Sequence, residues 1–497
     1  MKRHMPFLRL MTARLTTVGL RIAALATAAL LLPVNGQTQC TPAADSILDQ
    51  NFSLATLCSL VDKDSTNPRL LKPIPLGENW ELQPGAKIEL RKEIRTNFNM
   101  QHIEGTQTYD KPRFLYGLIN AMITNKKKDK SIFLELYGVY PNNYNPAWDP
   151  YESCERGLLQ AWYEYKFPNS PWSVKIGRQC LPNMGEMRLM GEGRYYWHYN
   201  AHDGVVATRK TDKMATYLIA AYMYTFKGRD EYTGRNFGQQ MRPANKFLTG
   251  VYNTWYLPKK YEFDLYNLNV HTFEASPYRS SDGTTGRAQM YGFGSRVRGP
   301  LYHKKDLGTL IWGTEAMTQV GNYGGDSKVF TYMLHGDLIW KFDKPWDPSI
   351  MLFGNIASGN KDPLSNKINR FDVQLDPSHY AYGLVNVVKL TNMNEIGVAF
   401  QVQPNKKTTI RTSAHQFWLN SAKDAWIGAD GRTIAWDVTG SSGRDLGREL
   451  DLMAKYEFNS HWSIECGGGY FFTGNFGKNV GHGADSWTVY CHQIFNF

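Results

Sequence analysis

The last eleven residues of the chain, Trp487–Phe497, alternate between two kinds of side chain with a period of two residues. Counting back from the C-terminus in twos gives one mostly apolar face that ends in aromatic residues, and the intervening positions give a mixed to polar face. This period is typical of a β-strand and excludes an α-helix, whose side chains repeat every 3.6 residues. The sequence therefore ends in a strand with one apolar face and one mixed to polar face.

The same alternation is clearest between Lys87 and Met100. Apart from Lys92, the even positions are mainly apolar, while the odd positions are charged or amides: Lys87, Glu89, Arg91, Glu93, Arg95, Asn97 and Asn99. Such a strand needs water on one side and hydrocarbon on the other. The segment Arg448–Phe458 repeats the pattern, with Glu449, Asp451 and Lys455 on its polar face. A strand that closes with aromatics at a lipid interface is typical of outer-membrane barrels.

Alternating segments of about ten residues recur along the rest of the chain, separated by polar or Gly-rich turns. The candidates are 131–140, 157–167, 172–179, 215–225, 247–257, 261–270, 287–298, 308–321, 349–357 and 408–419. With roughly 25 residues per strand and loop, the chain has room for about 18 strands. The predicted fold is therefore all-β: a transmembrane antiparallel β-barrel of about 18 strands that forms a monomeric pore in the bacterial outer membrane. The polar lumen of such a barrel accounts for the mean hydropathy of −0.45.

Three segments are predicted from the N-terminus. Residues 1–36 have five basic residues, no acids and an apolar run, which is typical of a signal peptide. Residues 37–85 are Pro-rich and lack the alternation, so we expect a periplasmic extension, and residues 86–497 form the barrel. Removal of the first segment lowers the formal net charge from +11 to +6. A weakly basic net charge favours an anionic solute. Because the protein is expected to be exported, nucleic acid is not an expected partner.

Six cysteines in an exported chain permit three disulfides. Sequence order suggests Cys40 with Cys58, Cys154 with Cys180 and Cys466 with Cys491, although six cysteines allow 15 pairings. None of the spacings is that of a CxxC metal site, and no cofactor is predicted.

Several blocks resemble the alginate export family of outer-membrane proteins. They are Gly177–Leu181 with Gly185, Arg188 and Asp203-Gly204; Trp312–Gly321, which contains Glu315; Ala357–Asn360 with the loop that follows; and Gly447–Leu452. Their order and spacing together carry the resemblance, which covers about residues 91–497. It implies a single-chain barrel that passes an anionic exopolysaccharide through a lumen lined by basic residues and some carboxylates.

The resemblance and the alternation together identify candidate pore-lining residues. They are Lys87, Glu89, Arg91, Glu93, Arg95, Arg178, Arg188, Glu315, Glu449, Asp451 and Lys455. The sequence departs from the family pattern at Cys180 and in the acidic Glu89 and Glu93, which leaves the identity of the cargo open.

No nucleophile, phosphate-binding or zinc-protease motif is present, so an enzyme is not predicted. The expected function is passive export or diffusion of an anionic, alginate-like polysaccharide or another anionic solute. A general porin for small solutes and a secreted β-rich binding or adhesin protein are the alternatives. The expected partners are the outer-membrane lipid, the solute and, as an open expectation, a periplasmic export partner.

Overall fold

A computed structural model describes residues 71–97, 109–142, 155–182, 184–185, 189, 201–225, 242–272, 287–323, 327–362, 365–373, 382–429 and 433–497. Eighteen antiparallel strands form the wall of the molecule. They are β2 (Trp80–Thr96), β4 (Arg113–Asn125), β5 (Lys130–Asn142), β6 (Glu155–Lys166), β7 (Trp172–Gln179), β8 (Ala201–Lys210), β9 (Met214–Thr225), β10 (Arg242–Leu257), β11 (Tyr261–Thr272), β12 (Ala288–Lys304), β13 (Gly308–Tyr323), β14 (Ser327–Lys341), β15 (Ser349–Ala357), β17 (Met393–Asn405), β18 (Thr408–Leu419), β21 (Asp445–Glu457), β22 (Trp462–Thr473) and β23 (Ser486–Asn496).

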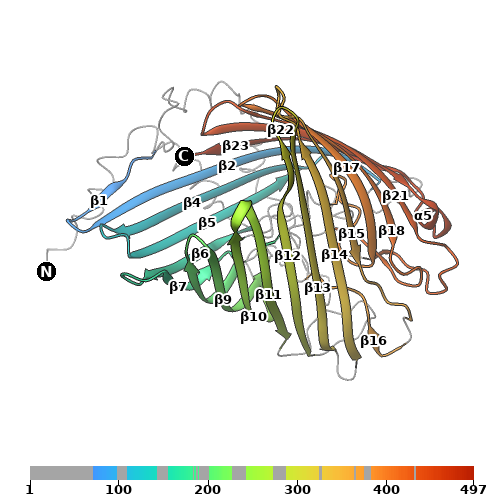
Figure 1. The fold of residues 1–497 in the computed structure, drawn as a ribbon, viewed down its shortest axis with the longest axis horizontal. Helices are drawn as coiled ribbons and strands as arrows, with labels where there is room; N and C mark the ends of the chain where they lie inside the picture. The colour runs from blue at the N-terminus through green and yellow to red at the C-terminus, as the bar shows by residue number, and fades with distance from the viewer. Residues whose placement is uncertain are drawn as a thin grey trace.

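The strands pair with their neighbours in chain order around the wall, as the colours from blue to red show in Figure 1. The first and last wall strands, β2 and β23, also pair, from Lys87 with Asn496 to Arg95 with Thr488. The amide of Phe497 donates a 2.8 Å hydrogen bond to the carbonyl of Ala86 and extends this seam. The sheet is therefore a closed barrel without a free edge, and the predicted fold class and strand number are confirmed.

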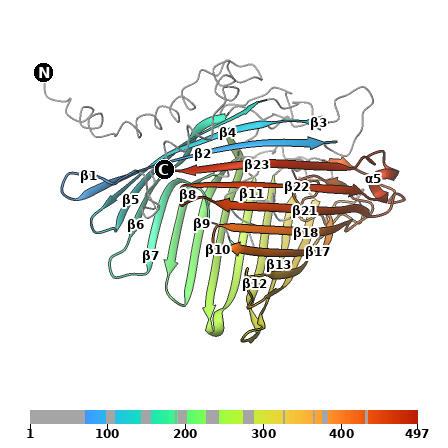
Figure 2. The same cartoon turned by 90° about the horizontal axis from the view of Figure 1, so that it is seen from above.

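Short and long connections lie at opposite ends of the barrel. The connections 126–129, 167–171 and 406–407 are short turns at the end that holds the C-terminus. The connections 358–392, 420–444 and 474–485 are long and lie at the other end, where Figure 2 shows helix α5 (Asn475–Asn479) away from the C-terminus. Because outer-membrane barrels have short periplasmic turns and longer extracellular loops, the C-terminus marks the periplasmic end.

Three short strands and a 3-10 turn complete the described structure around the wall. They are β1 (Ile74–Leu76) and β3 (Tyr109–Asp110), which pair with β2, β16 (Lys367–Ile368), which pairs with β14, and η2 (Pro258–Lys260). A separate hairpin is formed by β19 (Trp426–Ile427) and β20 (Thr433–Ala435). None of the described helices is long and apolar enough to cross a bilayer.

Polarity in the barrel wall is inverted with respect to a water-soluble protein. Apolar side chains alternate with polar ones along most of the wall strands, but the apolar set is exposed, as in Phe293 (55%), Phe330 (57%) and Leu452 (58%). Charged side chains on the alternate positions are buried, as in Glu89 (0%) and Glu315 (1%). This arrangement is stable only if hydrocarbon surrounds the wall and the polar groups face the interior. The protein is accordingly a bacterial outer-membrane protein.

The structure differs from the sequence prediction at both ends of the wall. Strand β2 begins at Trp80, six residues before the predicted start of the barrel at Ala86, because Trp80–Gly85 pair with β4 although their side chains do not alternate. Phe495 lies on the predicted lipid-facing row, but it is buried and stacks with Trp462 at a ring-centroid distance of 5.7 Å. The predicted residues 1–36 and most of 37–85 lie outside the described residues.

Candidate functional site: a charged lumen and its inner plug

The inward row of β2 is a ladder of alternating charges. Lys87 forms a salt bridge with Glu89, Arg91 with Glu93, and Arg95 with Asp110 at 3.1 Å. The guanidinium carbon of Arg91 also lies 3.9 Å from the ring centroid of Tyr490 on β23. Every cation of the ladder thus forms an ion pair with a carboxylate. A charge buried away from water is unstable unless an opposite charge is paired with it.

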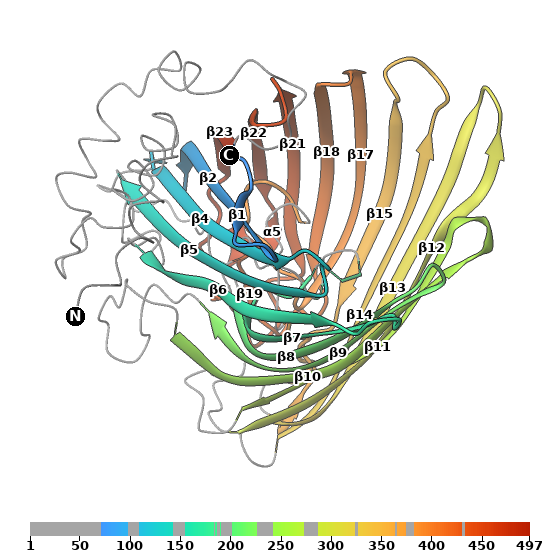
Figure 3. The ribbon, with the colours of Figure 1, turned by 90° about the vertical axis from the view of Figure 1, so that its left-hand side faces the viewer.

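The opposite wall has a second set of ion pairs. On β12, the Nε atom of Arg296 lies 2.5 Å from Asp264, and one of its terminal nitrogens lies 2.6 Å from Glu262. Arg298 lies 2.9 Å from Asp337, which also lies 3.1 Å from His335. In the closed order of eighteen wall strands β12 lies nine positions from β2 in either direction, so the two sets are on opposite sides of the interior around which the wall curves in Figure 3. The lumen is therefore lined with charges on both sides.

The inward faces of β17, β18 and β21 bring a histidine among carboxylates. His415 lies 2.7 Å from Glu395 and 3.3 Å from Asp451. Glu449, two residues before Asp451, accepts a 2.7 Å hydrogen bond from the amide of Val385, which belongs to the long loop after β15. A wall carboxylate thus anchors a loop inside the barrel.

We call the described parts of two extracellular loops the plug: residues 358–362, 365–373 and 382–392 from the first loop, and 420–429 and 433–435 from the second. The two loops are joined by a buried ion pair between Arg370 and Asp424 and by a 2.8 Å hydrogen bond from the indole of Trp426 to the carbonyl of Val387. Gln319 on β13 donates a 2.8 Å hydrogen bond to the carbonyl of Asp372. These contacts fix the plug to itself and to the wall.

The plug has an apolar core, which is unusual for the interior of a pore. Inward wall residues such as Tyr266, Met317 and Phe417 form one buried cluster with Phe371, Val385, Leu390 and Trp426 of the plug. Apolar contact removes water from this region, so the plug is held by the hydrophobic effect as well as by its polar anchors.

Burial of the inward rows changes along the barrel axis. On β18, Arg411 and Ser413 are half-buried near the short turns, whereas His415 and Phe417 are buried near the long loops. On β21, Lys455 and Met453 are likewise half-buried and Asp451 and Glu449 buried. Along β18 and β21 the inward side chains are therefore more accessible on the periplasmic side and packed on the extracellular side.

The geometry is that of an outer-membrane channel, and the comparisons with known proteins assign its family. The sequence model described as alginate export matches residues 90–488. The chain belongs to the alginate export family.

Solved structures with the same fold come from Pseudomonas aeruginosa. OccK9 (OpdG) has a TM-score of 0.55 at 10% identity, with 84% of this chain and 98% of that one covered. OprD has a TM-score of 0.53 at 8% identity, with 87% and 96% covered. OpdK, solved with vanillate, has a TM-score of 0.54 at 9% identity, with 84% and 98% covered. No curated protein matches the sequence.

In this member of the alginate export family, most of the predicted pore-lining residues that the structure describes lie on inward rows. These are Lys87, Glu89, Arg91, Glu93, Arg95, Glu315, Glu449, Asp451 and Lys455. They do not converge on one point: the β2 ladder is separate from Glu449 and Asp451, which contact the plug, while Glu315 accepts a 2.9 Å hydrogen bond from Tyr266.

Arg178 is a correction to the sequence prediction. It pairs in register with Ala161 and Asp203 and shares the row of Ile176, whose side chain is 52% exposed on the outer surface. Its guanidinium forms two hydrogen bonds with Asp203, at 2.7 and 2.9 Å. The block around Arg178 resembles the family, but side-chain parity assigns Arg178 to the outer wall. Arg188 lies outside the described residues.

The sequence prediction did not include several lumen residues that the structure brings together. Asp264, Arg296, His335, Asp337 and Glu395 are all buried on inward rows. Arg296 and Arg298 were recognisable as charged residues two positions apart, but their strand partners come from β11 and β14, and pairing between distant strands cannot be read from one sequence.

The buried charges in the described residues are mostly negative. Eleven carboxylates are buried, against five Arg and Lys residues. Among the described residues, no group of three or more His, Cys, Asp and Glu side chains is arranged to hold a metal ion. Cys466 and Cys491 are free thiols directly opposite each other, with sulfurs 2.7 Å apart. The disulfide between them stays a prediction; Cys40, Cys58 and Cys154 lie outside the described residues.

Proposed function

We propose that this member of the alginate export family is a passive channel for an anionic solute, with an acidic polysaccharide of the alginate type as the first candidate. The observation that carries the proposal is the β2 ladder, in which Lys87, Arg91 and Arg95 face the lumen four residues apart. That spacing corresponds to about 13 Å along the strand. Lys87 is 19% exposed, whereas Arg91 and Arg95 are buried, so the row would act on the repeated carboxylates of a polymer through contact at Lys87 and through its electric field elsewhere.

Exchange of partners explains how the ladder could pass a polyanion without trapping it. A carboxylate of the solute would replace Glu89 as the partner of Lys87, the most exposed cation of the ladder, so that one charge-assisted contact forms as another is lost. The net free energy gained when the solute binds is then small. Conduction requires binding that is favourable enough for entry and weak enough for exit.

Among the structural relatives, OpdK was solved with vanillate, which is a carboxylate. This supports a carboxylate-bearing solute for this fold but does not assign one to this chain, because only the fold is shared at 9% identity.

A general channel for small solutes is the second candidate. It is favoured by the excess of buried carboxylates over buried Arg and Lys in the described residues. Such a lumen would favour small cations over anions, and a polyanion would not compete with small ions for it.

The test replaces Arg91 with Gln and compares it with Arg178→Gln, which removes the same charge from the outer wall. A unit charge 10 Å from an ion contributes about 1.7 kcal/mol at an effective dielectric constant of 20, before screening. Although the side chain of Arg91 is only 5% exposed, its charge acts on ions in the lumen without contact. Reversal potentials in a salt gradient across a planar bilayer should shift toward cations for Arg91→Gln and stay unchanged for Arg178→Gln.

Block of the single-channel current by polymers distinguishes the polyanion channel from the general channel for small solutes. Alginate should reduce the single-channel current of the unmodified channel at concentrations at which a neutral glucan of equal length does not, and Arg91→Gln should weaken that block. Equal block by both polymers, or none by alginate, would favour the general channel.

A further inference from the structure

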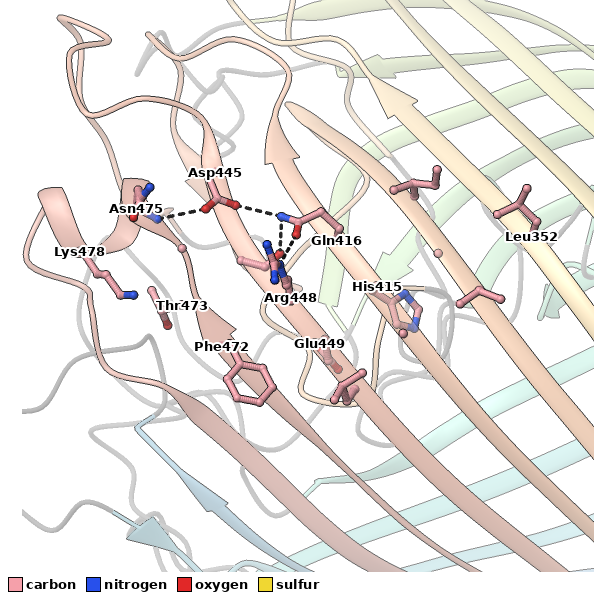
Figure 4. A pocket seen from close by; sticks show the side chains of 17 residues that line it. Leu352, His415, Gln416, Asp445, Arg448, Glu449, Phe472, Thr473, Asn475 and Lys478 are labelled. Carbon is pink, nitrogen blue, oxygen red and sulfur yellow. Dashed lines mark hydrogen bonds between the residues drawn. The ribbon is translucent and has the colours of Figure 1, made fainter.

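A groove of about 920 Å³ lies on the outer wall near the extracellular end of β15, β17, β18, β21 and β22. Figure 4 shows its side chains on the face of these strands and on helix α5. Its position is separate from the lumen, because Leu352 and Leu450 in its lining belong to the exposed apolar rows of the wall.

The floor of the groove is apolar and is hollowed at one small residue. Val398, Ala414 and Leu450 lie side by side on three paired strands. The methyl group of Ala414 is shorter than the side chains on either side of it, so a depression runs between Val398 and Leu450. Leu352, Ile396 and Phe472 extend the apolar lining. A hydrocarbon chain has the width and polarity to lie in this depression.

The extracellular end of the groove is polar and carries a positive charge. Arg448 and Lys478 are exposed there, and Asp445 is half-buried beside them. Gln416 connects the groups: its amide nitrogen donates to Asp445 at 2.9 Å and its oxygen accepts from Nε of Arg448 at 2.8 Å. The backbone amide of Asn475 donates a hydrogen bond to the other carboxylate oxygen of Asp445 at 3.3 Å.

This network fixes Arg448 but leaves its terminal nitrogens available. In the described part of the chain no carboxylate forms a salt bridge with Arg448 or Lys478. Asp445 is occupied by Gln416 and Asn475, and the three charged groups sum to +1. A phosphate, with several acceptor oxygens, can accept hydrogen bonds from a guanidinium fork and from an ammonium group that line the same groove.

The depth of the groove in the membrane agrees with its chemistry. Toward the periplasm, the row of Arg448 continues with Leu450 and Leu452, which are 54% and 58% exposed and face hydrocarbon. Toward the outside, the wall ends at the long loop that contains α5. The basic end therefore lies at the level of the lipid headgroups and the apolar floor at the level of the acyl chains.

We propose that the groove binds one phosphate-bearing lipid of the outer leaflet, with its phosphate on Arg448 and Lys478 and an acyl chain along Ala414. The site belongs to the outer wall and is independent of the solute that passes through the lumen. It makes the protein a specific lipid-binding protein as well as a channel.

The test measures lipid binding to the full chain in detergent by native mass spectrometry, with dioleoyl phosphatidic acid as the probe. Arg448→Gln and Lys478→Gln are the test variants. Lys328→Gln is the control, because Lys328 is an exposed lysine that precedes the lipid-facing Phe330 and Tyr332 at the same rim but does not line the groove. Heat-modifiable gel migration verifies that each variant is folded.

The unmodified chain should retain one phosphatidic acid molecule, and each test variant should bind it roughly tenfold more weakly, while the control binds as before. Dioleoyl phosphatidylcholine should bind more weakly than phosphatidic acid, because its choline carries a positive charge next to the phosphate, and inorganic phosphate should not displace the lipid. Equal affinity for the two lipids, unchanged affinity in both test variants, or displacement by inorganic phosphate would overturn the proposal.

Discussion

At the residue scale, the fold depends on the rule that neighbouring side chains on a strand face different solvents. Thr412 and Ser413 on β18 test this rule as a matched pair. Thr412 is exposed on the outer row, directly opposite Phe400 and Leu452, whereas Ser413 faces the lumen and donates a 3.2 Å hydrogen bond to Asp451.

Thr412→Arg should lower the free energy of unfolding by about 2–4 kcal/mol, because the guanidinium would lie in hydrocarbon. Ser413→Arg should have a much smaller effect, because the new cation lies in the aqueous lumen beside Asp451. Guanidinium titration of both variants in lipid vesicles measures the difference. Equal losses would contradict the assignment of the two faces.

Side-chain parity also explains which site residues the sequence could predict. Lys87 to Arg95 could be assigned to the lumen because their strand alternates cleanly between charged and apolar residues. Arg178 could not, since its assignment came from a family block and its own short strand alternates poorly around Gly177. Charge alone does not identify a pore-lining residue; its position relative to exposed neighbours such as Ile176 does.

At the element scale, the plug segment 382–392 is held close to the wall at Gly383. Its φ of +93° is a conformation that glycine adopts without strain, and a Cβ atom there would collide with the carboxylate of Glu449. Gly443 has a similar φ of +87° in the second loop, but a Cβ atom there would meet open space. Substitution of each glycine by alanine therefore distinguishes the effect of backbone strain, which both positions share, from the effect of steric contact with the wall, which arises only at Gly383.

Gly383→Ala should displace the plug segment from Glu449 and raise the mean single-channel conductance. Gly443→Ala introduces comparable backbone strain and should leave conductance at the level of the unmodified channel. Recordings in planar bilayers give both values. A similar conductance for all three proteins would show that segment 382–392 does not limit the flow of ions.

Five wall strands were not predicted, and the plug accounts for one of them, β14, whose inward Val329 and Met333 belong to clusters that include plug residues. On β4 and β14 the inward rows include Phe114, Tyr116, Val329 and Met333, which are buried in apolar clusters. Both faces of these strands are then rich in apolar residues, and the contrast that identifies a barrel strand is lost. β22 has three consecutive glycines and β8 few large side chains, so their patterns are weak, whereas β17 was missed despite a readable alternation. Strand number was still predictable, because chain length and typical strand spacing determine it.

At the scale of the whole molecule, closure of the barrel is the condition for its stability in a bilayer. Every wall strand has two hydrogen-bonded neighbours, and β23 supplies one neighbour to both β2 and β22. Hydrocarbon offers no hydrogen-bond partner to an open sheet edge, so the loss of one strand exposes two edges at a cost that no local rearrangement offsets.

Truncation after Asp485, which removes β23, should therefore abolish the folded form instead of weakening it in proportion to the residues lost. Deletion of Phe497 alone is the control: it removes the terminal hydrogen bonds to Ala86 but leaves the paired register from Lys87 to Arg95 intact. Both chains can be refolded into lipid vesicles and compared by heat-modifiable gel migration and protease resistance. A truncated chain that still showed the compact, protease-resistant form would mean that closure through β23 is dispensable, and the inside-out polarity of the wall would then need another explanation.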